Sequence, residues 1–282
     1  PAAVLAVVGV LGVIVRVSGG DPAPRAVAST DQIGVSHVHG LGINPDDGSL
    51  VVATHTGSFR IARDGGDAVR IGDSFQDTMG FTVTGPNHFL GSGHPDVAGI
   101  QRGQPARLGL IESTDAGDTW TEVSLSGEAD FHGLAFADDE VYGWDSGTGR
   151  FMVSADQIAW DTRSTIDLYG FAVDPDAADH IVAAVPDGLA ESTDGGRTWT
   201  GTDGPPLVAL SWDAEAGLWG ADGVGGVWRH EGSRWDRTAS VGGEPQALLA
   251  TPDALYTAAN SSDHATSIYR STDGGRDWGL IY

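Results

Sequence analysis

The histidines are the residues of this sequence whose positions best suit the binding of a metal ion. Four of the nine histidines lie beside glycines in the first half of the chain, at His39, His55, His94 and His132. Imidazole nitrogens bind zinc, copper, nickel or iron, and a thioether among them favours Cu(I). Met79, one of only two methionines, lies among these histidines along the chain. We therefore predict a site for copper or another transition metal, held by the four histidines and Met79.

Two further residues are expected behind these ligands. His37 and Asp130 each lie two residues before a predicted ligand, where a hydrogen-bonding neighbour orients an imidazole. The alternative is that the histidines only cap strands or form hydrogen bonds across a channel. Metal binding requires that they converge in space, so the elements that carry them decide between the two interpretations.

A short apolar segment recurs six times along the chain. Each copy has apolar and β-branched residues around Gly or Ala, is bounded by Gly, Pro or Asp, and predicts a strand. The copies begin at His39, Met79, His132, Tyr169, Val208 and Gln246. A second apolar segment follows each copy, and a third leads into a repeated turn. The six opening residues should therefore occupy one equivalent position in six repeated units.

The repeated turn is an octapeptide with the pattern Ser-x-Asp-x-Gly-x-x-Trp. Intact copies occupy residues 113–120, 192–199 and 271–278, and altered copies occupy 62–69, 154–160 and 229–235. Ser and Asp oxygens accept backbone N–H bonds in tight turns, Gly takes a left-handed backbone, and the Trp is expected to pack back onto its own unit.

Six units of about 40 residues with four strands each predict an all-β fold, a six-bladed β-propeller with four-stranded antiparallel blades. Propeller loops alternate between two faces, so His88, His180 and His230 should lie on the face of the octapeptides. The candidate ligands, with His37 and His264, should lie on the opposite face, around the axial funnel. We expect the ring to close by packing of the sixth blade on the first, or through the strand-like residues 33–38.

The octapeptides resemble the Asp-box, or bacterial neuraminidase repeat, of a propeller superfamily that includes sialidases, sortilin-type receptors and photosystem II assembly-factor-like proteins. The resemblance covers residues 37–282 and implies the fold together with hydrolase, receptor or assembly roles. Phe59-Arg-Ile-Ala62 is similar to a sialidase motif whose arginine binds the sugar carboxylate, but Ala62 replaces its Pro. A sialidase also needs a Tyr–Glu pair and further arginines in the funnel, and only Tyr169 fits this pattern.

A glycoside hydrolase is the enzyme that this sequence could encode. Glycosidases use two carboxyl groups, and carboxylates occur in the predicted funnel loops at Asp96, Asp145, Asp187 and Asp222. The alternative role of these aspartates is turn capping, which the Asp-Gly pairs at Asp187 and Asp222 favour.

Charge and the N-terminal segment limit the partners. The formal net charge of −24 makes nucleic acid and anionic lipid unsuitable partners.

Residues 2–15 are an apolar run followed by Arg16, so residues 1–18 are interpreted as a membrane anchor or signal segment and residues 19–36 as a linker. Fourteen helical residues reach about 21 Å of the roughly 30 Å bilayer core, so we expect residues before Pro1 to complete a retained single-pass anchor.

Three functions are compatible with these observations. The first is a membrane-anchored, extracytoplasmic propeller that acts as a binding or accessory subunit of an integral membrane protein complex and carries a His/Met metal site. The second is a secreted, sialidase-like glycoside hydrolase. The third is a metal-free structural adaptor or assembly factor.

Overall fold

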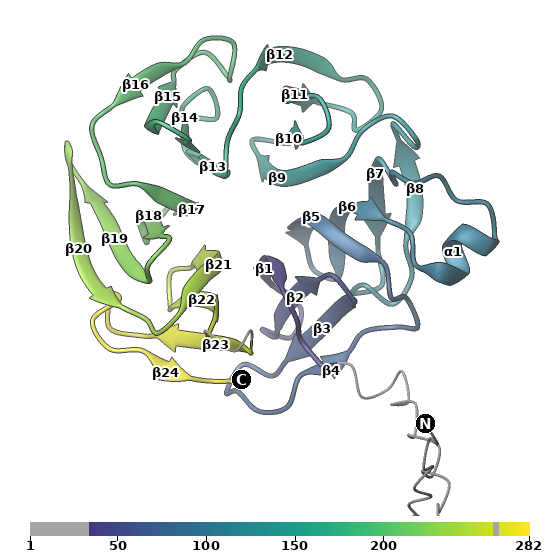
Figure 1. The fold of residues 1–282 in the computed structure, drawn as a ribbon, viewed down its shortest axis with the longest axis horizontal. Coiled ribbons are helices and arrows are strands. Elements are labelled where there is room, and N and C mark those ends of the chain that lie inside the picture. The colour runs from purple at the N-terminus through teal and green to yellow at the C-terminus, as the bar shows by residue number, and fades with distance from the viewer. Residues whose placement is uncertain (1–33, 262–264) are drawn as a thin grey trace, which may run out of the picture. The chain divides into compact units, whose positions relative to one another are not determined.

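The computed structural model describes residues 34–261 and 265–282, which form six four-stranded antiparallel sheets arranged in a ring (Figure 1). In each sheet the strands follow one another in sequence order, and the first strand lies nearest the axis. This arrangement is a six-bladed β-propeller, so the fold predicted from six repeated units is confirmed.

Each blade consists of four consecutive strands. Blades 1 to 3 contain β1 (Val38–Ile43), β2 (Leu50–Thr54), β3 (Gly57–Ile61), β4 (Val69–Arg70), β5 (Asp77–Gly85), β6 (His88–His94), β7 (Leu110–Ser113), β8 (Thr121–Ser124), β9 (Phe131–Ala137), β10 (Glu140–Asp145), β11 (Arg150–Ser154) and β12 (Asp161–Thr165). Blades 4 to 6 contain β13 (Gly170–Val173), β14 (Ile181–Val185), β15 (Gly188–Ser192), β16 (Thr200–Thr202), β17 (Leu207–Asp213), β18 (Gly217–Asp222), β19 (Gly226–Glu231), β20 (Arg234–Ser240), β21 (Glu244–Ala250), β22 (Leu255–Asn260), β23 (Thr266–Ser271) and β24 (Gly279–Leu280). A short helix, α1 (Val97–Gln101), lies between β6 and β7.

Glycine allows the innermost strands of neighbouring blades to approach one another. A Cβ atom added to Gly40 of β1 would lie 2.9 Å from the Cβ of Phe81 in β5. One added to Gly80 of β5 would lie 2.5 Å from the carbonyl oxygen of Phe131 in β9. Both separations are shorter than van der Waals contact, so the glycines that follow His39 and Met79 set the spacing of blades 1 to 3.

The intact octapeptides form the turns between the third and fourth strands of blades 2, 4 and 6. In blade 4, Ser192 Oγ accepts from the backbone N–H of Gly196 at 2.9 Å and donates to Asp194 Oδ1 at 2.8 Å. Hydrogen bonds from the side chain and backbone of Thr198, and from Ser192, lower the pKa of Asp194 to about 2. The corresponding Ser–Gly bonds in blades 2 and 6 are 2.8 and 3.0 Å long.

The expectation that the octapeptide tryptophan packs on its own unit holds for Trp278, which donates to the Gly275 carbonyl of its own turn at 3.2 Å, whereas Trp199 also bonds to the preceding blade. Trp199 Nε1 of blade 4 donates to Ser164 Oγ in β12 of blade 3 at 2.9 Å, and Ser164 Oγ donates to the Gly196 carbonyl at 2.6 Å. The altered turn of blade 3 repeats this bridge, because Trp160 Nε1 donates to Ser124 Oγ in β8 of blade 2 at 3.0 Å. In both cases one serine of the preceding blade hydrogen-bonds to the tryptophan and to a backbone carbonyl of the turn.

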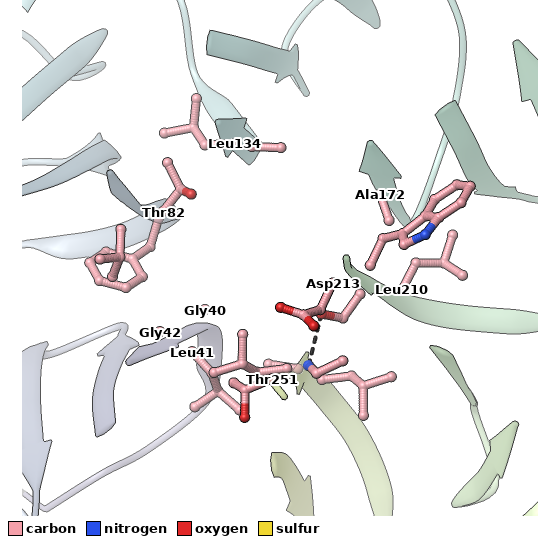
Figure 2. A pocket seen from close by; sticks show the side chains of 18 of the residues that line it. Gly40, Leu41, Gly42, Thr82, Leu134, Ala172, Leu210, Asp213 and Thr251 are labelled. Carbon is pink, nitrogen blue, oxygen red and sulfur yellow. Dashed lines mark hydrogen bonds between the residues drawn. The ribbon is translucent and has the colours of Figure 1, made fainter. Parts of the chain in front are cut away.

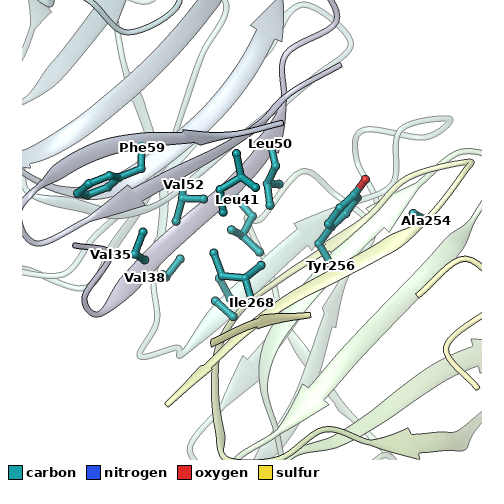
Figure 3. Close-up of a cluster of buried hydrophobic side chains, with 12 residues drawn as sticks. Val35, Val38, Leu41, Leu50, Val52, Phe59, Ala254, Tyr256 and Ile268 are labelled. Atoms are coloured by element: carbon teal, nitrogen blue, oxygen red, sulfur yellow. The ribbon is translucent and has the colours of Figure 1, made fainter. Parts of the chain in front are cut away.

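The ring closes by packing of blade 6 on blade 1, the first of the two predicted alternatives. Figure 3 shows the shared core, in which Leu41 and Val52 of blade 1 lie near Tyr256 and Ile268 of blade 6. The Val35 backbone N–H also donates to the Tyr282 hydroxyl at 3.3 Å. Residues 34–37 form no strand, and blade 1 takes all four of its strands from consecutive sequence.

The predicted anchor (residues 1–18), most of the linker, and His264 lie outside the described residues. Within residues 34–261 and 265–282, no helix is long and apolar enough to span a membrane.

The bridge between blades gives a stability prediction. Ser164→Ala should lower the free energy of unfolding by about 1–2 kcal/mol, because it leaves the Trp199 N–H and the Gly196 carbonyl without their shared partner. Urea denaturation followed by tryptophan fluorescence measures the change. Ser233→Ala, in the exposed turn between β19 and β20, is the matched control. Equal midpoints for the two variants would contradict the bridging role of Ser164.

Candidate metal centre

A cavity of about 670 Å³ follows the propeller axis and is lined by the first strand of every blade. Figure 2 shows Leu41, Leu134, Ala172 and Leu210, from four different blades, around the same opening. Five of the six aligned opening residues also line this cavity, and they are His39, His132, Tyr169, Val208 and Gln246. Apolar and polar groups both line the cavity, and imidazoles are among the polar ones.

Backbone irregularities place these opening residues. The pairing of the first and second strands shifts register at His39, Met79, His132, Val208 and Gln246. A β-bulge leaves one residue unpaired and re-aims its side chain, and bulges are frequent beside functional sites. Alternation along a strand cannot predict this orientation, whereas alignment of the six repeats placed the residues in one column.

Three donor atoms lie close together where blades 1 and 2 meet, and we call His39, His55 and Asp77 the first set. His39 Nε2 lies 3.3 Å from His55 Nδ1. Asp77 Oδ1 lies 2.8 Å from His55 Nδ1 and 3.5 Å from His39 Nε2. An ion bound tetrahedrally at 2.0–2.2 Å separates its ligands by about 3.4 Å, so these distances are close to those of a coordinated zinc ion.

Each member of the first set comes from a different element. His39 lies at the bulge of β1, His55 directly follows β2, and Asp77 begins β5 of the next blade. Asp77 Oδ1 is buried and lacks a well-aligned hydrogen bond despite its short distance to His55. A carboxylate oxygen in this position is available to a cation.

His37 lies beside the first set, but its hydrogen bonding orients it. Gln246 Oε1 accepts from the Val38 backbone N–H at 3.0 Å, which directs the amide nitrogen of Gln246 to His37 Nδ1 at 2.7 Å. The Nδ1 lone pair is thereby used, and a neutral His37 carries its proton on Nε2. The His37 ring stacks on His55, with centroids 4.6 Å apart. His37, His39 and His55 each offer one ring nitrogen within 4.8 Å of the others.

The electrostatics of the first set favour a neutral His39 beside an ionised Asp77. Burial lowers the pKa of His39, and the neighbouring His55 lowers it further against the opposing effect of Asp77. Burial would raise the pKa of Asp77, but His39 and His55 outweigh it and hold that pKa below its usual value. Neutral imidazole and carboxylate are the forms that bind metals.

A second imidazole–carboxylate group lies where blades 2 and 3 meet, and we call His94, Asp130 and His132 the second set. Asp130 Oδ2 lies 3.3 Å from His132 Nε2 and 3.6 Å from His94 Nε2. His94 Nδ1 lies 2.8 Å from the Ala106 carbonyl, which can only accept, so Nδ1 carries a proton. In neutral His94 the Nε2 lone pair therefore faces the carboxylate.

The structure divides the predicted ligands between these two sets. His39 and His55 join the first set, and His94 and His132 join the second. The sequence did not predict Asp77, because its proximity to His39 depends on contact between two blades. Asp130 was predicted to lie behind the ligands, but its Oδ2 faces two imidazoles. Met79 is half-buried at the bulge of β5 and does not line the axial cavity.

Three of the candidate glycosidase carboxylates hold turns. Asp96 caps α1 by accepting from the Gly99 N–H at 2.6 Å, and Asp222 Oδ1 accepts from the Gly226 N–H at 2.8 Å. Buried Asp145 pairs with Arg150 at 2.9 Å and accepts from the Asp130 N–H at 3.1 Å. Asp187 is exposed at the turn between β14 and β15. Asp145 thereby supports the loop that carries Asp130.

The sialidase-like arginine lies away from the axis. Arg60 is half-exposed in β3, 3.8 Å from Asp47, and does not line the axial cavity. His88 and His180 lie next to Glu112 and Glu191, at 2.6 and 2.5 Å.

No family model matches the chain. The dispase autolysis-inducing protein of Streptomyces mobaraensis is 28% identical over 206 residues, which cover 61% of this chain and 54% of that protein. The chain thus spans about half the length of this curated relative.

Solved structures share the fold. A GH74 enzyme of Niastella koreensis superimposes with a TM-score of 0.61 at 16% identity, covering 88% of this chain and 45% of that one. YCF48 bound to D1 peptide superimposes with a TM-score of 0.54 at 15% identity, covering 88% of this chain and 82% of that one. These similarities support the propeller architecture.

Asp145 gives a prediction that separates turn support from catalysis. Burial would raise the pKa of Asp145, but hydrogen bonds from Thr148 and Arg150 hold it below its usual value of 3.8. Asp145→Asn should lower the free energy of unfolding by about 3 kcal/mol near neutral pH, because it leaves Arg150 without its buried partner.

The pH dependence follows from the lowered pKa. The contribution of Asp145 is fully present above pH 3.8 and is lost as the pH falls through the lower pKa of the folded state. The stabilities of the wild type and Asp145→Asn should therefore converge in acid, as measured by chemical denaturation at several pH values. Exposed Asp187→Asn is the control, and an equally small effect of both substitutions would argue against the structural role.

Proposed function

We propose that this protein is an extracytoplasmic, membrane-anchored propeller that serves as a binding or accessory subunit and carries a divalent transition metal at the first set. The observation that carries the proposal is the set of three donor atoms, His39 Nε2, His55 Nδ1 and Asp77 Oδ1, whose pairwise distances are 2.8–3.5 Å. Three protein ligands leave coordination positions for water or another ligand.

The donors favour zinc or iron(II) in place of the Cu(I) suggested by Met79. Two imidazoles and one carboxylate suit borderline divalent ions, whereas Cu(I) prefers thiolate and thioether ligands. Among the described residues, no thioether contributes to the lining of the axial cavity. His37 orients the first set through its stacking on His55, as partners behind metal-binding imidazoles commonly do.

The accessory role is supported by what the similar proteins are named for. YCF48 was solved with a bound D1 peptide, and the curated relative is named for inducing autolysis of dispase. Both descriptions refer to another protein. A propeller held at a membrane by residues 1–18 would present its faces to an integral membrane complex in a similar way.

The metal proposal predicts graded effects on affinity. His55→Ala removes a ligand and should weaken the tighter Zn²⁺ binding step by more than about 100-fold, and His37→Ala removes an orienting partner and should weaken it by about 10–100-fold. Competition with a chromophoric chelator measures both values. His88→Ala, on the opposite face, is the control and should leave the affinity unchanged. Equal affinities in wild type and His55→Ala would overturn the first site.

The anchor predicts how the chain fractionates. The full chain should remain with membranes after a high-salt wash, because an apolar segment is not displaced by ions. Val8→Asp combined with Leu11→Asp places two charges in this segment and should release the protein. The isosteric changes Val8→Ile and Leu11→Ile form the matched control. Salt release of the wild type would contradict the anchor.

A further inference from the structure

Two polar atoms of the second set lack a well-aligned hydrogen bond. Asp130 Oδ1 and His132 Nε2 are buried and have no well-aligned hydrogen bond in the described part of the chain. Asp130 is 8% exposed, so water replaces these bonds poorly. Buried polar groups without partners are costly, and a bound ion is one of the ways in which proteins satisfy them.

Hydrogen bonds also fix the second set in a form suited to a cation. The Ala106 carbonyl holds the proton of His94 on Nδ1, so two electron-rich atoms, His94 Nε2 and Asp130 Oδ2, face each other at 3.6 Å. The loop of Asp130 is held on both sides, because its N–H donates to Asp145 Oδ1 and its carbonyl accepts from the Ser146 N–H at 3.0 Å. The carboxylate is therefore positioned before any ligand binds.

We propose that the second set, His94, Asp130 and His132, binds a second divalent ion such as Zn²⁺ or Fe²⁺, separate from the ion of the first set. Each set then supplies two imidazoles and one carboxylate from the boundary between two blades. The donor atoms of the second set lie within 4.8 Å of one another, so a small rotation of the side chains brings them to coordination distance.

The two centres are neighbours, because blade 2 contributes to both. Asp77 of the first set and His94 of the second are directly paired across β5 and β6. Directly opposed residues of antiparallel strands have Cα atoms about 4.5–5.5 Å apart. Divalent ions bound at two neighbouring sets repel each other, so the second ion should bind more weakly than the first.

Metal stoichiometry of the full chain tests this second site. The protein is stripped with chelator, titrated with Zn²⁺ by calorimetry, and its metal content is measured after gel filtration. The wild type should bind two ions in two steps. His94→Ala should bind one, His55→Ala should bind one, and the double variant should bind none. His180→Ala, on the opposite face, should still bind two.

The variants separate the two proposals. His132→Ala is an independent second variant at this site. If His94→Ala and His132→Ala both keep the wild-type stoichiometry, the proposed second site is wrong, whatever the result for His55→Ala. If His55→Ala keeps that stoichiometry while His94→Ala loses one ion, the first site is wrong and the second remains. Thermal unfolding of each stripped variant checks folding. Visible absorption of bound Co²⁺ should change in both single variants, because each removes an imidazole.

Discussion

The packing of side chains between neighbouring blades is the interaction on which the ring depends, and in blades 3 and 4 a hydrogen bond from the turn tryptophan to a serine of the preceding blade adds to it. In the pairs Trp199–Ser164 and Trp160–Ser124 the serine also donates to a carbonyl of the same turn, so turn and neighbour are fixed together. Among the described residues no strand pairs with a strand of another blade, so the relative positions of the blades are set by side-chain packing and by single hydrogen bonds such as that from the Phe131 N–H to Ser92 Oγ. The geometry of a site assembled from two blades therefore depends on the side-chain contacts between those blades and on the glycines of the inner strands.

Much of the fold could be predicted from the sequence because each unit carries its own local signals. The octapeptide predicts its turn because the residues that hydrogen-bond within it lie only two to four positions apart, as Ser192, Asp194 and Thr198 do. The role of Trp199 was harder to predict, because its partner Ser164 lies 35 residues away in another blade. Repetition shows that the indole is required and does not show what it contacts.

The candidate site was only partly predictable for a similar reason. Aligning the repeats placed His39 and His132 in one column, and both reach the axial cavity. The division into two sets depends on Asp77, which stands at the first position of β5, and on register shifts that no alternation reveals. Bulges turn the column residues towards the axis, so the spacing of the histidines along the chain is a poor guide to their spacing in space.

Because the chain is rich in aspartates, the presence of one at a given position does not indicate a binding site. The hydrogen bonds of each aspartate distinguish those that hold turns from those that could bind a ligand. Asp194, Asp222 and Asp96 each accept from a backbone N–H of their own turn with one oxygen and from a further N–H or O–H donor with the other. Asp77 and Asp130 instead present oxygens to imidazoles, and each has one buried oxygen with no well-aligned donor. An aspartate that caps a turn is satisfied without a ligand, whereas these two remain incomplete. Carboxylates of this second kind, lying beside imidazoles at the boundaries between blades, are the ones expected to attract a cation.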